Sequence, residues 1–153
     1  MRTVKKAKPA IILLVEDDRG SQELTRRALD EGKFRNELRI VEDGEEALAY
    51  LFRRGKYKDP ATSPTPDLLL LDLNLPRVDG REVLEQVRAD SKLCRMAVVV
   101  LTNSRQEEDI LRSYELGCNS FITKPVDMNQ FMQVIQALER YWLQIGVLPP
   151  KTE

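Results

Sequence analysis

Residues 11–18 read IILLVEDD, an unbroken apolar run that ends in three acidic residues. Two further runs have the same form: LLLL at 68–71 comes directly before Asp72, and AVVVL at 97–101 comes directly before Thr102. Apolar runs of this length without alternation are typical of strands buried on both faces, as in parallel sheets covered by helices. The sequence therefore predicts a parallel sheet whose strands end in polar residues.

Weaker strand patterns lie at 38–41 and 120–123, and helical spacing of apolar residues covers 21–31, 45–54, 81–89, 110–116 and the segment from about Asp127. Strand and helix thus alternate five times along the chain. This alternation favours an α/β fold, a doubly wound five-stranded parallel sheet with right-handed crossovers. We expect the flavodoxin-like strand order 2-1-3-4-5, in which the first and third strands are neighbours.

Several helix starts carry a capping signature, an Asp or Ser followed three residues later by Glu or Gln. The pairs are Asp43 with Glu46, Asp79 with Glu82, Ser104 with Glu107, and Asp127 with Gln130. Between the second helix and the third strand, residues 55–66 (GKYKDPATSPTP) have the Pro and Ser/Thr content of a loop, to which we assign no role.

Composition narrows the function classes. The 153 residues carry 24 basic and 25 acidic side chains and no histidine, which excludes imidazole chemistry and gives no sign of nucleic-acid binding. No apolar run approaches the roughly 20 residues that span a bilayer, so we expect a cytoplasmic protein. Cys94 and Cys118 are expected to be small buried residues. We expect a basic tail over 1–9, one domain over 10–145 and a C-terminal tail over 146–153.

The polar residues that follow the strands point to a site. Ligands of open α/β sheets bind outside the carboxyl ends of the strands, near the point where strand order reverses. Glu16, Asp17 and Asp72 are expected to converge there, flanked by Thr102 and Lys124. Clustered carboxylates stay ionised beside a positive charge, and ligands that are all oxygen suit Mg²⁺. Taken singly, each residue fits a plain structural role, and Asp18 is expected to be a helix cap.

At these residues the chain resembles the receiver domain of two-component response regulators. The matching motifs are LVEDD at 14–18, LDLNLPxxDG at 71–80, VVLT at 99–102 and FITKP at 121–125, and the resemblance spans residues 11 to about 140. A finer resemblance is to the stand-alone response regulators of cyanobacterial phytochromes. It rests on the loop before the third strand, DLNLPxxDGREVL at 72–84 and the YWL tail at 141–143.

The resemblance implies a role for each matched residue. Asp72 accepts a phosphoryl group from the phosphohistidine of a sensor histidine kinase, with no small-molecule turnover. Mg²⁺ is held by Asp17 and Asp72, by the main-chain carbonyl of Asn74, and through water by Glu16. Thr102 and Lys124 contact phosphoryl oxygens, and Phe121 turns inward as Thr102 moves. The resemblance also implies a cis peptide between Lys124 and Pro125.

The end of the chain is apolar, with Trp142, Leu143 and Ile145 on or next to the last helix. Such a surface either folds back on its own domain or forms an interface. In the phytochrome-linked relatives the neighbouring face, which includes Phe121, is implicated in dimerisation. We therefore expect an isologous homodimer, with a phytochrome-type kinase and an unidentified downstream protein as further partners and no direct DNA or membrane binding.

Two other classes of function compete with a phosphoacceptor. A phosphorylation-independent interaction module with the same fold would tolerate loss of Asp72, Asp17 or Lys124, and all three are present. An aspartyl-phosphate phosphatase needs a D-x-D motif, and Asp72-Leu73-Asn74 lacks the second acid.

Overall fold

The computed structural model describes residues 9–31, 36–107, 117–118 and 120–144, and for residues 135 and 138–144 it describes the main chain alone. Five parallel strands form one sheet: β1 (Ala10–Val15), β2 (Asn36–Val41), β3 (Leu68–Asp72), β4 (Ala97–Thr102) and β5 (Ser120–Thr123). Their order is β2-β1-β3-β4-β5, which confirms the predicted doubly wound arrangement. The strand order reverses between β1 and β3, so these two carboxyl ends lie side by side.

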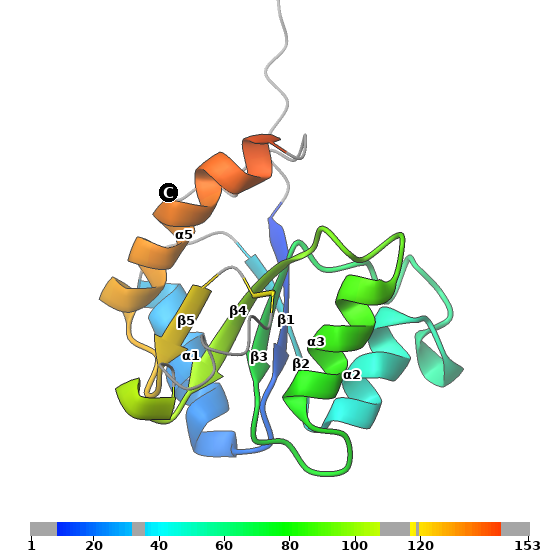
Figure 1. Cartoon of the computed structure of the whole chain (residues 1–153), viewed down its shortest axis with the longest axis horizontal. Coiled ribbons are helices and arrows are strands. Elements are labelled where there is room, and N and C mark those ends of the chain that lie inside the picture. The colour runs from blue at the N-terminus through cyan, green and yellow to red at the C-terminus, as the bar shows by residue number, and fades with distance from the viewer. Residues whose placement is uncertain (1–8, 32–35, 108–116, 119, 145–153) are drawn as a thin grey trace, which may run out of the picture.

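The helices are α1 (Arg19–Glu31), α2 (Gly44–Leu51), α3 (Gly80–Ala89), α5 (Met128–Gln144) and the short 3-10 turn η1 (Gly55–Tyr57). Helices α1 and α5 cover one face of the sheet, and α2 and α3 cover the other (Figure 1). The helix predicted over 110–116 lies outside the described residues. Among the described helices, none combines the length and apolar character needed to cross a membrane.

The central strands are buried on both sides, as their unbroken apolar runs predicted. Along β1, Ile12 and Leu14 face the core under α1 and α5, whereas Leu13 and Val15 face the core under α2 and α3. All four are fully excluded from solvent. Burial of each such side chain contributes about 1.5–3 kcal/mol before the entropic cost of folding. The sheet is therefore a rigid base for the residues at its carboxyl edge.

The predicted caps are confirmed at their backbone contacts. The side chains of Asp43, Asp79, Ser104 and Asp127 accept from the main-chain N–H three residues on, at 2.7, 3.0, 3.1 and 2.8 Å. Asp18 caps α1 in the same way, through the N–H of Ser21 at 2.7 Å. The four capping aspartates are therefore occupied at helix ends and are distinct from the acids of the site.

Helix α2 stops at Leu51, three residues before the predicted end at Arg54, which corrects that prediction. Arg53 adopts a left-handed conformation (φ 56°). The N–H of Arg54 then donates to the carbonyl of Ala49 at 2.8 Å, and that of Arg53 to Tyr50 at 3.3 Å. This is the Schellman pattern that closes a helix, formed here on an arginine instead of the usual glycine.

The loop over 55–66 is held by side chains of neighbouring elements. Arg39 on β2, Arg53 and Tyr50 donate to the carbonyl oxygens of three successive residues, 62, 63 and 64, at 2.7, 3.4 and 2.8 Å. At its start, the hydroxyl of Tyr57 in η1 donates to Oε1 of Glu46 on α2 at 2.5 Å. The loop is therefore attached to α2, to the turn after α2 and to β2, through Tyr57 at its start and residues 62–64 near its end.

Two glycines allow the backbone to approach closely near the carboxyl edge of the sheet. A Cβ on Gly44 would lie 1.8 Å from the carbonyl oxygen of Val78, and one on Gly80 would lie 2.4 Å from that of Asp72. No real Cβ sits this near to a backbone atom, so both positions require glycine. The starts of α2 and α3 are thereby pressed against the segment that follows β3.

The two cysteines, Cys94 and Cys118, are half-buried, whereas the sequence analysis expected them to be fully buried.

Candidate functional site: an acidic pocket at the carboxyl edge of the sheet

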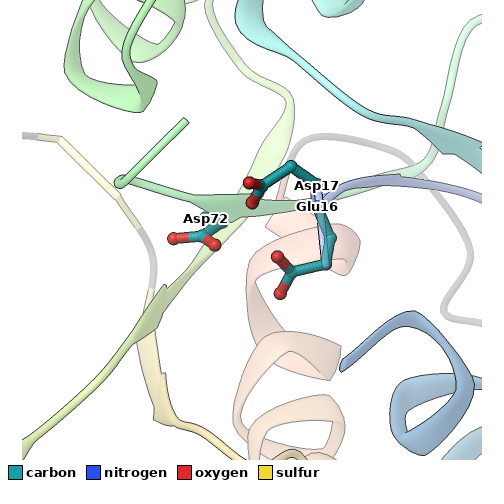
Figure 2. Close-up of side chains that lie close together, drawn as sticks. All are labelled: Glu16, Asp17 and Asp72. Atoms are coloured by element: carbon teal, nitrogen blue, oxygen red, sulfur yellow. The ribbon is translucent and has the colours of Figure 1, made fainter. Parts of the chain in front are cut away.

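Three carboxylates meet where β1 and β3 end. Glu16 and Asp17 follow β1, Asp72 closes β3, and one oxygen from each lies within 4.8 Å of the others (Figure 2). Glu16 and Asp72 are buried, at 1% and 2% exposed, whereas Asp17 lies at the exposed rim. The sequence prediction that these three residues converge is confirmed.

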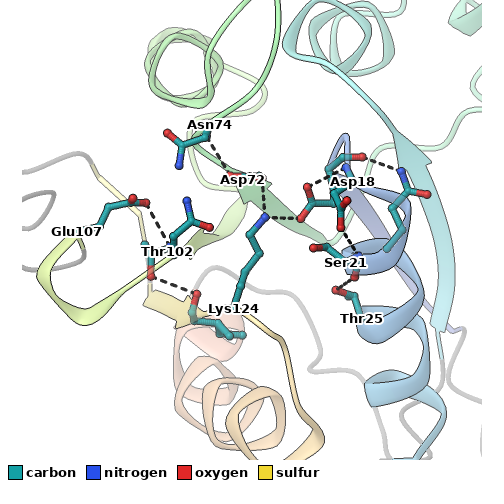
Figure 3. Close-up of polar contacts among 12 residues, drawn as sticks. Asp18, Ser21, Thr25, Asp72, Asn74, Thr102, Glu107 and Lys124 are labelled. Carbon is teal, nitrogen blue, oxygen red and sulfur yellow. Dashed lines mark hydrogen bonds and ion pairs between the residues drawn. The ribbon is translucent and has the colours of Figure 1, made fainter.

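Lys124 reaches this cluster from the turn after β5. Its Nζ lies 2.7 Å from Oε1 of Glu16 and 2.8 Å from Oδ2 of Asp72 (Figure 3). The lysine side chain is only 15% exposed, so solvent screens these pairs weakly. The Lys124–Pro125 peptide is cis, as the resemblance implied. The lysine therefore supplies positive charge between two buried carboxylates from different strands.

The pKa values of Glu16 and Lys124 are both raised in the pocket. Burial raises the pKa of Glu16 to about 7; the hydrogen bond from Lys124 opposes this rise, and the neighbouring Asp72 adds to it. For Lys124, burial lowers the pKa, but the hydrogen bonds to Asp72 and Glu16 outweigh burial and the net pKa is raised. The pocket therefore favours a positive charge, and a further cation would be attracted to it.

Asp72 is held by the main chain as well as by Lys124. Its Oδ1 accepts from the N–H of Asn74 at 2.9 Å, while Oδ2 accepts from Lys124. Each carboxylate oxygen thus has one donor, and the close approach of Gly80 to the carbonyl of Asp72 fixes the backbone below. The structure confirms that Asn74 lies beside the site. The use of its carbonyl as a metal ligand stays a prediction.

Thr102 and Phe121 lie at the adjoining strands. The hydroxyl of Thr102, fully buried at the end of β4, donates to the carbonyl of Ile122 at 3.4 Å. Phe121 on β5 is half-buried and packs against the core under α2 and α3. In this structure the hydroxyl of Thr102 thus bonds to β5. The switch roles of both residues stay predictions.

The predicted interface is only partly visible. Phe121 is described, the main chain of Trp142 and Leu143 belongs to α5, and Ile145 lies outside the described residues.

The donor set fits a divalent cation. Carboxylate oxygens, which Glu16, Asp17 and Asp72 supply, are the ligands that hard cations such as Mg²⁺ or Mn²⁺ prefer. Asp17 is exposed, so solvent reaches this side of the cluster.

One residue beside the site was not predicted. Gln22 on α1 donates from Nε2 to the carbonyl of Glu16, and no motif in the sequence marks it. Helical register places it one turn after the Asp18 cap and therefore over the end of β1. This helical register is the signal from which the position of Gln22 beside the site could have been predicted.

A family model described as the response regulator receiver domain matches residues 12–136. The chain belongs to the receiver-domain family of response regulators. The chain is 42% identical to Response regulator Rcp1 of Synechocystis sp. over 141 residues, which are 92% of this chain and 94% of that protein.

Solved structures agree with this assignment. The bacteriophytochrome response regulator AtBRR matches the receiver domain with a TM-score of 0.78 and 47% identity, over 86% of this chain and 94% of that one. The phosphorylated cyanobacterial phytochrome response regulator RcpA gives 0.70 and 43%, over 92% and 99%. The Mn²⁺-bound form of Rcp1 gives 0.70 and 42%, over 92% and 99%. The resemblance to phytochrome response regulators is confirmed.

Proposed function

We propose that this receiver domain is a phosphoacceptor of a two-component phosphorelay. Asp72 takes a phosphoryl group from the phosphohistidine of a sensor histidine kinase of the phytochrome type. The observation that carries the proposal is the placing of Asp72: buried, bonded by Lys124 at 2.8 Å and by the N–H of Asn74 at 2.9 Å, and beside two further acids. The phosphorylated state named for the related RcpA supports it.

The transfer is a displacement at phosphorus. A carboxylate oxygen of Asp72 forms a bond to phosphorus while the bond from phosphorus to the imidazole nitrogen breaks, and its electron pair stays on that nitrogen. The incoming group is anionic, so a carboxylate can attack only where positive charge offsets the repulsion. Lys124 already supplies one such charge at Asp72. The product is an acyl phosphate on Asp72.

We propose Mg²⁺ as the resident cation, held by Asp17 and Asp72, by the carbonyl of Asn74, and through water by Glu16. When bound, it supplies positive charge that neutralises the phosphoryl oxygens. The three clustered carboxylates support this assignment, as does the Mn²⁺-bound form of the related Rcp1. Chelation by EDTA is expected to abolish phosphorylation.

The conformational change that signals phosphorylation starts at the hydroxyl of Thr102. To reach a phosphoryl oxygen on Asp72, its hydroxyl must leave the carbonyl of Ile122. A ligand shifts a conformational equilibrium only through such a difference between states. Because Ile122 follows Phe121 on β5, this exchange of partners is the proposed trigger for Phe121 to turn inward.

The test is intact-mass measurement after incubation with acetyl phosphate and Mg²⁺. The wild type is expected to gain the mass of one phosphoryl group, and Asp72→Asn is expected to gain none. Asp79→Asn is the matched control, because Asp79 is an exposed helix cap that asparagine can replace. Full incorporation into Asp72→Asn would place the acceptor elsewhere and refute the proposal.

The partner assignments need separate experiments. We propose that the protein acts in the cytoplasm with a phytochrome-type kinase. Phosphotransfer from purified kinases, with a phytochrome-type kinase competing against others, tests this choice of kinase. We further propose an isologous homodimer through Phe121, Trp142, Leu143 and Ile145, supported by the apolar sequence of that region. Light scattering that gives a monomer mass at every concentration would refute the dimer.

A further inference from the structure

The side-chain amide of Gln22 joins the ends of two strands. From the first part of α1, its Nε2 donates to the carbonyl oxygen of Glu16 at 2.8 Å and to Oε2 of Glu42 at 3.0 Å. Glu16 is the first residue after β1, and Glu42 is the first residue after β2. Both partners are acceptors only, so the amide must present its nitrogen to them, and one N–H serves each.

This bridge fixes the main chain at a residue of the acidic pocket. The N–H of Glu16 donates to the carbonyl of Val41 at 3.0 Å, which continues the pairing of β1 with β2 by one residue. Its carbonyl oxygen is held by Gln22 instead of by a strand. The backbone of Glu16 is thus bonded on both sides, and its side chain turns inward to Lys124 at 2.7 Å.

The second partner of the amide is itself held in place. The main-chain N–H of Glu42 donates to Oε2 of Glu46 at 3.5 Å, and Oε1 of Glu46 accepts from the hydroxyl of Tyr57. Gln22 therefore bonds to a strand end that is tied through α2 to η1. On the side away from the pocket, the amide thus bonds an exposed carboxylate whose main chain is bonded to α2.

We infer that Gln22 is a positioning residue of the acidic pocket. By holding the carbonyl of Glu16, it sets the path of the main chain from Glu16 to Asp17 and so the direction of both carboxylates. The inference rests on the proposed function, in which these acids serve a divalent cation. Residues that orient metal ligands through hydrogen bonds contribute to affinity because the ligands need no rearrangement on binding.

The probe is Mn²⁺ binding to the full chain, read from the electron paramagnetic resonance signal of the free ion. Gln22→Met keeps the length of the side chain and removes both donors. Its dissociation constant for Mn²⁺ is expected to rise by about tenfold, the low end of the range for residues that orient metal ligands. Glu23→Gln, an exposed neighbour on α1, is the control and is expected to stay within about twofold of the wild type.

A second readout separates positioning from general loss of structure. Labelling of Gln22→Met by acetyl phosphate is expected to be slow at limiting Mg²⁺ and to reach the wild-type rate at saturating Mg²⁺. A Gln22→Met protein that binds Mn²⁺ as the wild type does, or that is equally slow at every Mg²⁺ concentration, would overturn the inference. Failure of the proposed function looks different, because then the wild type itself is not labelled while the Mn²⁺ titration still reports on Gln22.

Discussion

The ammonium nitrogen of Lys124 lies 2.8 Å from Oδ2 of Asp72, although 52 positions separate the two residues in the sequence. The same nitrogen bonds Glu16, so one lysine neutralises acids from two other strands. Removing one partner of a buried ion pair leaves an uncompensated charge, which is strongly destabilising.

We therefore expect Lys124→Met to lower the free energy of unfolding by about 3–5 kcal/mol in the presence of EDTA. Added Mg²⁺ is expected to restore part of the loss, because it brings positive charge back to the same acids. Urea denaturation with and without Mg²⁺ measures both effects. Lys92→Met, at an exposed position, is the control. Equal midpoints for Lys124→Met and the wild type would contradict the prediction.

The contact between Tyr57 and Glu46 fastens the start of the loop to α2. The pKa of Tyr57 is raised, first by burial and then by the hydrogen bond to the Glu46 carboxylate, so the hydroxyl stays protonated and donating at all ordinary pH values. Tyr57→Phe is expected to cost about 1.5–3 kcal/mol, the range for hydrogen bonds to charged groups.

Tyr50→Phe provides the comparison for that experiment. It loses a hydrogen bond to an uncharged acceptor, the carbonyl of Pro64, and is expected to cost about 0.5–1.5 kcal/mol. Chemical denaturation of the two variants in parallel gives the difference. A larger loss for Tyr50→Phe than for Tyr57→Phe would show that the Glu46 contact is the weaker one.

Gly44 is expected to tolerate no side chain. Because a Cβ there would meet the carbonyl of Val78 at 1.8 Å, Gly44→Ala must push α2 away from the segment after β3, at a cost of about 3 kcal/mol. Thermal or urea unfolding measures the loss. Gly20→Ala in α1 is the control, since its Cβ would contact only the end of the Asp18 side chain, at 3.3 Å. Comparable stabilities for the two variants would disprove the steric argument.

Asp127 provides a pH-dependent prediction. Its pKa is lowered, chiefly by the backbone N–H of Gln130. A carboxyl whose folded pKa is depressed stabilises the fold above its ordinary pKa, and this contribution is lost as pH falls through the folded value. Asp127→Asn keeps the cap without the charge, so we expect its stability relative to the wild type to improve as the pH is lowered from about 6 to about 3.

The measurement is the difference in urea midpoint between variant and wild type across that pH range. Because both proteins share every other acid, the difference isolates Asp127. Asp127→Ala, which removes the cap itself, is expected to cost about 1 kcal/mol at neutral pH. A midpoint difference between Asp127→Asn and the wild type that does not change with pH would contradict the assignment.

The sheet and the acidic pocket were predictable because the signals are local. Unbroken apolar runs marked the buried strands, and the first polar residue after each run marked the edge where Glu16, Asp17 and Asp72 gather. The caps were predictable for the same reason, since each lies three residues from its partner. Once the strand order was set, the arrival of Lys124 from the end of β5 followed.

The missed features depend on contacts that the sequence does not display. The early end of α2 rests on Arg53 in a left-handed conformation, and the sequence signal for that turn is normally a glycine. Gln22 is one polar residue among several on α1, and its role depends on Glu42, which lies 20 positions away. Each is decided by tertiary packing and not by local pattern.

The three side chains that hold the loop before β3 bind main-chain oxygens of residues 62–64, and Arg53 also donates to the side-chain hydroxyl of Thr65 at 2.9 Å. Every amino acid offers a main-chain oxygen, so the exposed residue 62 can change identity without loss of its bond, whereas Ser63 is buried and Thr65 contributes its hydroxyl. An insertion or deletion would instead bring the wrong carbonyl to each donor. Length, more than composition, is the property of this segment that the fold constrains.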